Sequence, residues 1–131
     1  MSTRVDTVRV IVIVEDEPDM RMMIRELLRS DPRIEVVGEA TNAHDAVEAA
    51  RSLDPGLIVL DHQIEGDIMG IDAAPLLKKA APNAKILLFS AFDMRKEAEA
   101  EPAIDEFLSK SDVRKLVSTV QRMLGLSRPP G

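Results

Sequence analysis

Hydrophobic residues in this chain form short continuous runs, which alternate with longer stretches in which apolar positions recur every three or four residues. Continuous runs of aliphatic and β-branched residues are typical of strands buried on both faces of a parallel sheet. The clearest run, Leu-Ile-Val-Leu at residues 57–60, ends directly on Asp61. The pattern predicts strands at residues 8–14, 34–37, 57–61 and 84–90, and a last strand within residues 104–109.

The longer stretches predict amphipathic helices between these strands. The first begins at Pro18, a residue suited to the first turn of a helix, and the second spans residues 43–53. In the third helix, Asp72 is the expected N-cap, and Pro75 falls early enough to be tolerated.

The last two helices differ in how clearly they are patterned. Residues 93–101 are charged and alanine-rich and are cut off by Pro102, so we expect a short or frayed helix there. Ser111 or Asp112 is the expected N-cap of the final helix. Gly125 is expected to end that helix.

Strand and helix alternate five times, and parallel strands joined through helices have right-handed crossovers. The sequence therefore predicts an α/β fold with a doubly wound, five-stranded parallel sheet of flavodoxin-like order 2-1-3-4-5 and helices on both faces. In this order the ligand crevice lies beside the ends of strands one and three. We expect one domain over residues 8–124, preceded by a polar N-terminal extension, residues 1–7, and followed by a tail or linker stump, residues 125–131.

Composition narrows the classes of function. The 131-residue chain carries a formal net charge of −6, whereas a protein that coats nucleic acid needs a basic surface, so we expect no direct nucleic-acid binding. The absence of cysteine excludes disulfides and Cys-ligated zinc, and it favours a cytoplasmic location. The apolar run at residues 10–14 is far too short to cross a membrane, and no membrane association is expected.

Polar side chains follow four of the predicted strands at the point where each strand ends. They are Glu15 and Asp16, Asp61, Ser90 and Lys110. Because the carboxyl ends of parallel strands meet at one edge of the sheet, we expect these side chains to share one site.

Three carboxylates brought together repel one another unless they share a proton or bind a cation. Mg²⁺ is the expected ion, because it takes one or two carboxylates, several waters and the oxygens of a phosphate-bearing partner. The Asp61 carboxylate is then the expected nucleophile toward phosphorus, and the Lys110 ammonium and Ser90 hydroxyl match the other oxygens of the transferred group.

At these residues the chain resembles the receiver domain of bacterial two-component response regulators, over about residues 8–124. The matching segments are Glu-Asp-Glu-Pro at residues 15–18, Asp61, Ser-Ala at residues 90–91 and Phe-Leu-Ser-Lys at residues 107–110. Residues 36–40 and 110–112 look most like receivers that precede helix-turn-helix output domains.

The resemblance implies a role for each matching residue. Asp61 would be the phosphoacceptor, and Mg²⁺ would be held by Asp61, Glu15, Asp16 and the backbone carbonyl of Gln63. Ser90 would be the switch hydroxyl, Lys110 the phosphate-binding lysine, and Phe107 the aromatic residue that changes rotamer. The implied partners are a sensor histidine kinase or phosphotransfer protein, an output protein or a missing effector domain, and a second copy of the chain after phosphorylation.

Several positions depart from the family pattern. Glu15 stands where aspartate is commoner, the loop over residues 61–70 is one residue longer than usual, and Glu65 takes the place of an expected proline. The segment between Ser90 and Lys110 is short. These departures surround the face that would change on phosphorylation.

The residues leave three functions open. The leading hypothesis is a phosphorylatable signalling module that is not itself an enzyme, apart from limited autodephosphorylation. The alternatives are a receiver-like interaction module that phosphorylation does not switch, and a Mg²⁺-dependent phosphohydrolase, for which Gln63 is not the second acid such enzymes need. Near the site, His62, Glu65 and Asp67 are additional candidates for contacts with the ion or the phosphoryl group.

Overall fold

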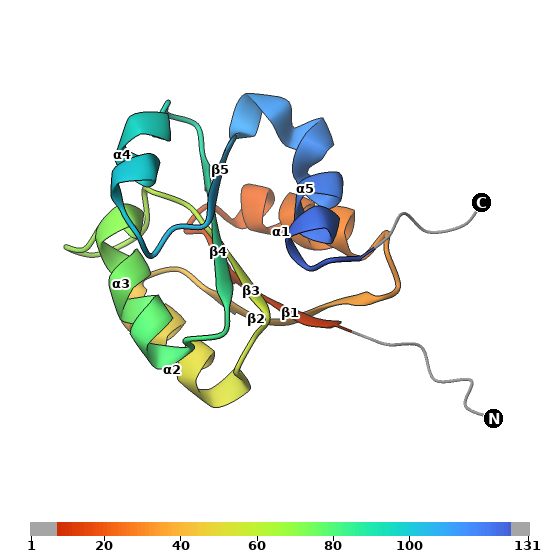
Figure 1. The fold of residues 1–131 in the computed structure, drawn as a ribbon, viewed down its shortest axis with the longest axis horizontal. Helices are drawn as coiled ribbons and strands as arrows, with labels where there is room; N and C mark the ends of the chain where they lie inside the picture. The colour runs from red at the N-terminus through yellow and green to blue at the C-terminus, as the bar shows by residue number, and fades with distance from the viewer. Residues whose placement is uncertain (1–7, 127–131) are drawn as a thin grey trace.

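The structure is a computed structural model, and it describes residues 8–126 of the chain. Strands and helices alternate along it, and the five strands form one parallel sheet in the order β2-β1-β3-β4-β5 (Figure 1). The strands are β1 (Val8–Val14), β2 (Ile34–Ala40), β3 (Leu57–Leu60), β4 (Lys85–Ser90) and β5 (Glu106–Ser109). The helices are α1 (Pro18–Leu28), α2 (Ala43–Leu53), α3 (Gly70–Ala80), α4 (Arg95–Ala100) and α5 (Leu116–Met123), and a 3₁₀ helix, η1 (Lys110–Lys115), leads into α5.

The sheet lies between two layers of helices, with α1 and α5 on one face and α2, α3 and α4 on the other (Figure 1). Alternate residues of β3 and β4 supply the two cores, as the two-residue period of a strand requires. Ile58 and Leu60 pack toward α2 and α3, whereas Leu57 and Val59 pack toward α1 and α5. The predicted fold class and the predicted strand order are therefore confirmed.

The third helix begins earlier than predicted, and Asp72 is not its cap. The N-cap is Met69, and Asp72 lies in the first turn. The earlier start has a local cause, because His62 provides acceptors for the first N–H groups: its carbonyl accepts from Gly70 at 2.7 Å and its Nδ1 from Ile71 at 3.4 Å. Pro75 consequently lies in the second turn, and the helix continues through it to its end.

The predicted cap of the last helix was also wrong. The Ser109 hydroxyl, and not Ser111 or Asp112, accepts from a backbone N–H, that of Ser111 at 3.2 Å. Ser109 is therefore the N-cap of η1, and the backbone of Asp112 within η1 is not helical. The predicted end is correct, because Gly125 has a positive φ of 72° and ends α5.

One other prediction on the limits of elements has a clear outcome. The segment after β4 forms a helix of six residues, α4, as its weak pattern indicated. The predicted N-terminal extension, residues 1–7, and residues 127–131 of the predicted tail lie outside the described part of the chain. Within residues 8–126, no helix is long and apolar enough to cross a membrane.

Candidate functional site

The sheet delivers the predicted site residues to the carboxyl ends of its strands. Glu15 directly follows β1, Asp61 follows β3 and Lys110 follows β5. Backbone bonds extend the ladder by one step beyond the strands, since the Asp61 N–H donates to Val14 and the Glu15 N–H donates to Ala40, each at 3.0 Å. The position of each side chain is therefore fixed by the register of the sheet.

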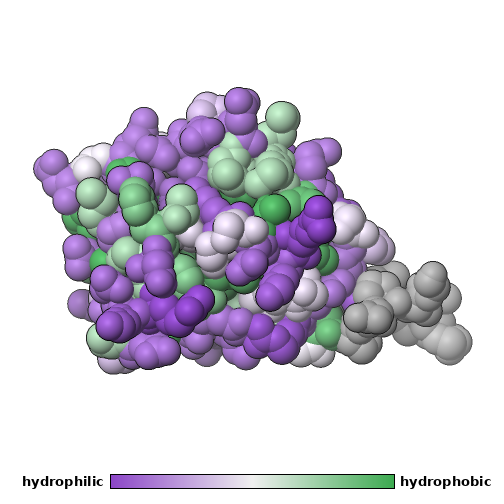
Figure 2. Space-filling model, turned by 90° about the horizontal axis from the view of Figure 1, so that it is seen from above, coloured by the Kyte–Doolittle hydropathy of each residue, from purple (hydrophilic) through white to green (hydrophobic). Residues whose placement is uncertain are grey.

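Glu15, Asp16 and Asp61 form an acidic cluster, in which one carboxylate oxygen of each lies within 4.8 Å of the others. Glu15 and Asp61 are buried, with 2% and 7% of their surface exposed, and Asp16 is more exposed. The cluster lies in a cleft of about 430 Å³ that is also lined by Glu17, Gln63, Ala91, Phe92 and Lys110. Seen from above relative to the view in Figure 1, the surface is largely hydrophilic, with small apolar patches between the polar residues (Figure 2).

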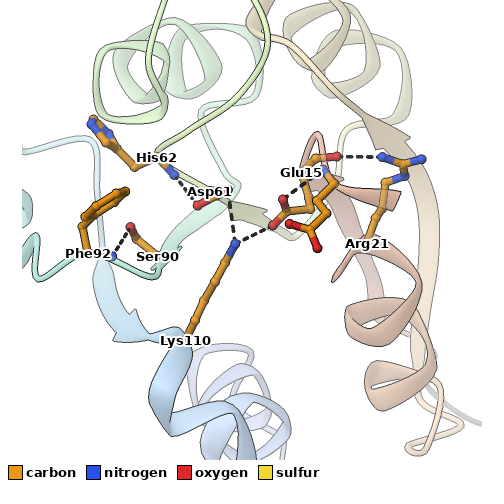
Figure 3. Close-up of polar contacts among 8 residues, drawn as sticks. Glu15, Arg21, Asp61, His62, Ser90, Phe92 and Lys110 are labelled. Atoms are coloured by element: carbon orange, nitrogen blue, oxygen red, sulfur yellow. Dashed lines mark hydrogen bonds and ion pairs between the residues drawn. The ribbon is translucent and has the colours of Figure 1, made fainter. Parts of the chain in front are cut away.

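The Lys110 ammonium lies between two of these carboxylates (Figure 3). Its Nζ is 2.7 Å from Oε1 of Glu15 and 3.2 Å from Oδ2 of Asp61. Oε2 of Glu15 accepts from the backbone N–H of Glu17 at 3.2 Å. Glu15 thus has a hydrogen-bond donor for each carboxylate oxygen.

Burial and the neighbouring charges shift the pKa values of both Glu15 and Lys110. Burial raises the pKa of Glu15, the hydrogen bond from Lys110 opposes that rise, and the charge of Asp61 adds to it, so the pKa lies above its usual value. Burial alone would lower the pKa of Lys110. The hydrogen bond to Glu15 and the charge of Asp61 outweigh it and leave that pKa raised.

The acidic cluster fits a divalent ion with oxygen ligands. The three carboxylates lie in a partly buried cleft with one ammonium, which contacts Glu15 and Asp61, so the cluster keeps an excess of negative charge. Gln63 lines the same cleft. Oxygen donors at the mouth of an open cleft, where waters can complete the shell, suit Mg²⁺.

The peptide after Asp61 is tightly packed against α3. Asp61 Oδ1 accepts from the His62 N–H at 2.8 Å, which orients the carboxylate, while the His62 ring points away from Lys110 and the acidic cluster (Figure 3). A Cβ atom at Gly70 would lie 2.0 Å from the carbonyl oxygen of Asp61. A residue without a side chain is therefore required where α3 begins.

Ser90 and Phe107 lie apart from the acidic cleft. Ser90 is fully buried, and its Oγ accepts from the Phe92 N–H at 3.1 Å (Figure 3). Phe107 is half-buried beside α4, where the Arg95 guanidinium lies 5.9 Å from the centre of its ring. Phe107 lines a different cleft of about 470 Å³, whereas the Ser90 hydroxyl is hydrogen-bonded to the loop between β4 and α4.

Two acidic candidates from the long loop do not join the cluster. Glu65 is exposed, and its N–H donates to the Thr41 carbonyl at 2.9 Å, which pairs the loop with the start of α2. Asp67 is also exposed. The cluster that could hold an ion consists of Glu15, Asp16 and Asp61.

Sequence reasoning missed three residues that shape the site. Gly70 leaves room for the Asp61 carbonyl at the start of α3, and Phe92 lines the cleft with 51% of its surface exposed. Arg21 donates to the backbone carbonyl of Glu15 at 2.8 Å. Gly70 was a usable signal, because a glycine in the loop after Asp61 indicates that two backbone segments approach closely. The Arg21 contact has no sequence signal, because a spacing of six positions between the two partners is not typical of any local motif.

Comparison with known proteins identifies relatives that match most of the described region. The family model described as response regulator receiver domain matches residues 11–121. The chemotaxis protein CheY of Thermotoga maritima is 40% identical over 81 residues, which cover 62% of this chain and 66% of that protein. A protein-glutamate methylesterase/protein-glutamine glutaminase of Methanosarcina acetivorans is 33% identical over 118 residues, which cover 86% of this chain.

A solved structure gives the same result for the fold. A two-component response regulator of the LuxR family from an Aurantimonas species superposes with a TM-score of 0.81 at 28% identity, over 91% of this chain and 86% of that chain. The chain spans only 33% of the methylesterase and 37% of the Escherichia coli nitrate/nitrite response regulator NarL.

Proposed function

Because the chain belongs to the response regulator receiver domain family, we propose that it is a phosphoacceptor module of bacterial two-component signalling, phosphorylated on Asp61. The observation that supports this most strongly is the cleft in which Asp61 lies beside two other carboxylates and the Lys110 ammonium. The domain would extend over residues 8–124 and act in the cytoplasm. Its phosphodonor would be a sensor histidine kinase or a phosphotransfer protein.

In the proposed reaction a carboxylate oxygen of Asp61 attacks the phosphorus of a phosphohistidine. The new P–O bond forms as the P–N bond breaks, and the electron pair of that bond returns to the imidazole nitrogen of the donor. The hydrogen bond from the His62 N–H to Oδ1 holds the carboxylate in one orientation for this attack. Orientation of the reacting group is a large part of what such a site contributes.

Glu15, Asp16, Asp61 and the backbone carbonyl of Gln63 would hold the Mg²⁺ ion. When bound, the ion supplies positive charge that offsets the repulsion between the carboxylates and the incoming phosphoryl group. Lys110 would exchange its bond to Asp61 for a phosphoryl oxygen, from a position that is already 3.2 Å from Oδ2. A short ammonium-to-oxygen contact of this kind stabilises charge on the transferred group.

The readout would run through Ser90 and Phe107. Ser90 would give up its bond to the Phe92 N–H and turn its hydroxyl toward the phosphoryl group. Phe107 would then change rotamer, which requires it to leave its contact with Arg95 on α4. The surface of α4 and β5 would change as a result and alter affinity for an output protein, an effector domain or a second copy of the chain.

A second candidate is a receiver-like interaction module that phosphorylation does not switch. The contact between Arg95 and the Phe107 ring favours it, because a cation over the ring stabilises one rotamer. In that case partner binding would be the same for the wild type and for Asp61→Ala.

Intact-mass measurement after incubation with acetyl phosphate, with and without Mg²⁺, tests the proposal. We expect the wild type and an Asp67→Asn control to gain one phosphate in the presence of Mg²⁺, and Asp61→Asn to gain none. The control changes an exposed aspartate in the same loop. A gain of phosphate by Asp61→Asn, or no gain by the wild type under either condition, would contradict phosphorylation of Asp61.

A further inference from the structure

The backbone carbonyl of Glu15 has a partner outside the sheet. Nη1 of Arg21, on α1, donates to that carbonyl at 2.8 Å (Figure 3). The Arg21 side chain is 22% exposed, so this bond is largely shielded from water. The guanidinium contacts the residue that begins the acidic segment without touching any carboxylate of the cluster.

Arg21 is itself oriented by a carboxylate from the neighbouring strand. Nε of Arg21 lies 3.1 Å from Oε1 of Glu39, near the end of β2, and Oε2 of Glu39 accepts from Arg25 at 2.7 Å. Because the guanidinium is planar, fixing its Nε edge on Glu39 also fixes the direction of Nη1. The chain of contacts therefore runs from β2, through α1, to the carbonyl of Glu15.

These contacts complete the restraint of Glu15. Its N–H donates to Ala40 in the sheet ladder, its carboxylate is held by Lys110 and by the Glu17 N–H, and its carbonyl is held by Arg21. The carboxylate contact with Lys110 would have to change when an ion binds, but the contact with Arg21 would not. Arg21 is therefore the side chain that fixes the backbone of Glu15 whether or not an ion is present.

We infer that Arg21 is a positioning residue for the divalent-ion site, and that Glu39 orients it. The inference rests on the proposed function in one respect, that the acidic cluster binds Mg²⁺. Residues outside the ligand shell that fix ligands in place change metal affinity by about tenfold or more when they are removed. The inference also gives a role to Glu39, in the segment at residues 36–40 that resembles other receivers.

The charge of Arg21 and its positioning role predict opposite effects of an Arg21 substitution on Mg²⁺ affinity, so the inference can be tested. Arg21 is a cation near a cation site, so its charge alone weakens Mg²⁺ binding, and removing that charge should strengthen binding. A positioning role predicts the reverse. Arg21→Lys keeps the charge but loses the fork that contacts both Glu15 and Glu39, and it separates the two effects most cleanly.

The experiment is isothermal titration of the full chain with MgCl₂. We expect Arg21→Lys and Arg21→Gln each to weaken Mg²⁺ binding about tenfold. Arg29→Gln is the matched control. Arg29 directly follows α1 and forms an exposed ion pair with Glu26, so its replacement should not weaken Mg²⁺ binding. Glu39→Gln should weaken binding in the same direction as the Arg21 variants, and combining it with Arg21→Gln should add little, because both changes break one chain of contacts.

Urea unfolding of each variant, followed by circular dichroism, reports whether the fold is intact. Glu39→Asp provides an independent test should the Arg21 variants fail to fold: it keeps the charge but shortens the side chain that orients Arg21, so it should also weaken Mg²⁺ binding. With folded variants, unchanged or tighter Mg²⁺ binding in Arg21→Lys and Glu39→Asp would overturn the inference and leave the proposed function standing. Absence of Mg²⁺ binding by the wild type would overturn both.

Discussion

Gly70 shows how closely one residue limits the geometry of Asp61. Its N–H donates to the carbonyl of His62 at 2.7 Å, and the position where a Cβ would stand is 2.0 Å from the carbonyl oxygen of Asp61. The neighbour in this clash is backbone and cannot move aside like the end of a long side chain. The start of α3 and the orientation of Asp61 are thus coupled through a position that only glycine fits.

Gly70→Ala is expected to lower both stability and phosphorylation. Overpacking against backbone costs about 1–3 kcal/mol, and the shift it forces would displace the Asp61 peptide. Urea unfolding and the rate of Mg²⁺-dependent phosphorylation by acetyl phosphate are the measurements. Gly66→Ala is the control, because Gly66 has a φ of +95° but open space around it, so this change introduces backbone strain without the clash. Phosphorylation of Gly70→Ala at the wild-type rate would show that the helix start can shift without disturbing Asp61.

The packing of α5 against the rest of the domain depends on a buried carboxylate in the turn after α1. Asp31 is 2% exposed; its Oδ2 accepts from Gln121 of α5 at 2.9 Å, and both its oxygens accept from Arg33. Principally because of the hydrogen bonds from the Arg33 side chain, the pKa of Asp31 lies well below its usual range. The charged Asp31, which lies between α1 and β2, therefore holds α5 against the rest of the domain through its bond with Gln121.

The lowered pKa of Asp31 gives a stability effect of definite sign. Its folded-state pKa lies below its unfolded value, so the carboxylate stabilises the fold above about pH 4 and loses that contribution as the pH falls below it. Asp31→Asn should therefore lower the free energy of unfolding by about 2 kcal/mol at pH 7.

Urea unfolding at pH 7, 5 and 3.5 measures this effect, with Asp67→Asn as an exposed control. The difference in unfolding free energy between wild type and Asp31→Asn should stay constant from pH 7 to 5 and shrink toward pH 3.5. A difference that does not change over this range would show that Asp31 contributes by shape and not by charge.

The whole domain carries an excess of negative charge at one end of its sheet. The net charge of the chain is −6, and the cleft at the strand ends holds three carboxylates beside the Lys110 ammonium, which contacts Glu15 and Asp61. Repulsion at this site opposes folding, since the same groups lie far apart in the unfolded chain. Binding of Mg²⁺ at the proposed ligands Glu15, Asp16 and Asp61 would relieve this repulsion and so raise the stability of the whole domain.

Mg²⁺ is expected to raise the melting temperature of the wild type. Binding to the folded state alone stabilises it by about 2.7 kcal/mol at an ion concentration 100 times the dissociation constant. Asp16→Asn should raise the melting temperature without Mg²⁺, because it relieves repulsion, and should remove most of the Mg²⁺-dependent rise.

Differential scanning calorimetry with MgCl₂ and with an equal ionic strength of NaCl distinguishes ion binding from screening. A rise of the same size in both salts, or a full Mg²⁺ effect in Asp16→Asn, would mean that the acidic cluster does not bind the ion.

Much of the fold could be predicted, because its signals are local. Runs such as residues 57–60 identify strands, and the alternation of strands with amphipathic helices leaves few topologies. Helix starts were harder to predict. The acceptors on His62 that start α3 at Gly70, and the Ser109 hydroxyl that caps η1, compete with equally suitable caps such as Asp72 and Ser111, and only the packed chain selects between them.

By itself, the sequence determined the parallel sheet, its order and the edge at which Glu15, Asp61 and Lys110 meet, because strand period, chain direction and strand ends are properties of the chain in order. Tertiary structure alone decided which groups touch. Lys110 pairs with Glu15 across 95 positions of sequence, Arg21 reaches the Glu15 carbonyl, and the Ser90 hydroxyl bonds to the next loop instead of facing Asp61. Such contacts depend on rotamers and on distances between elements, which neither spacing nor hydrophobic period encodes.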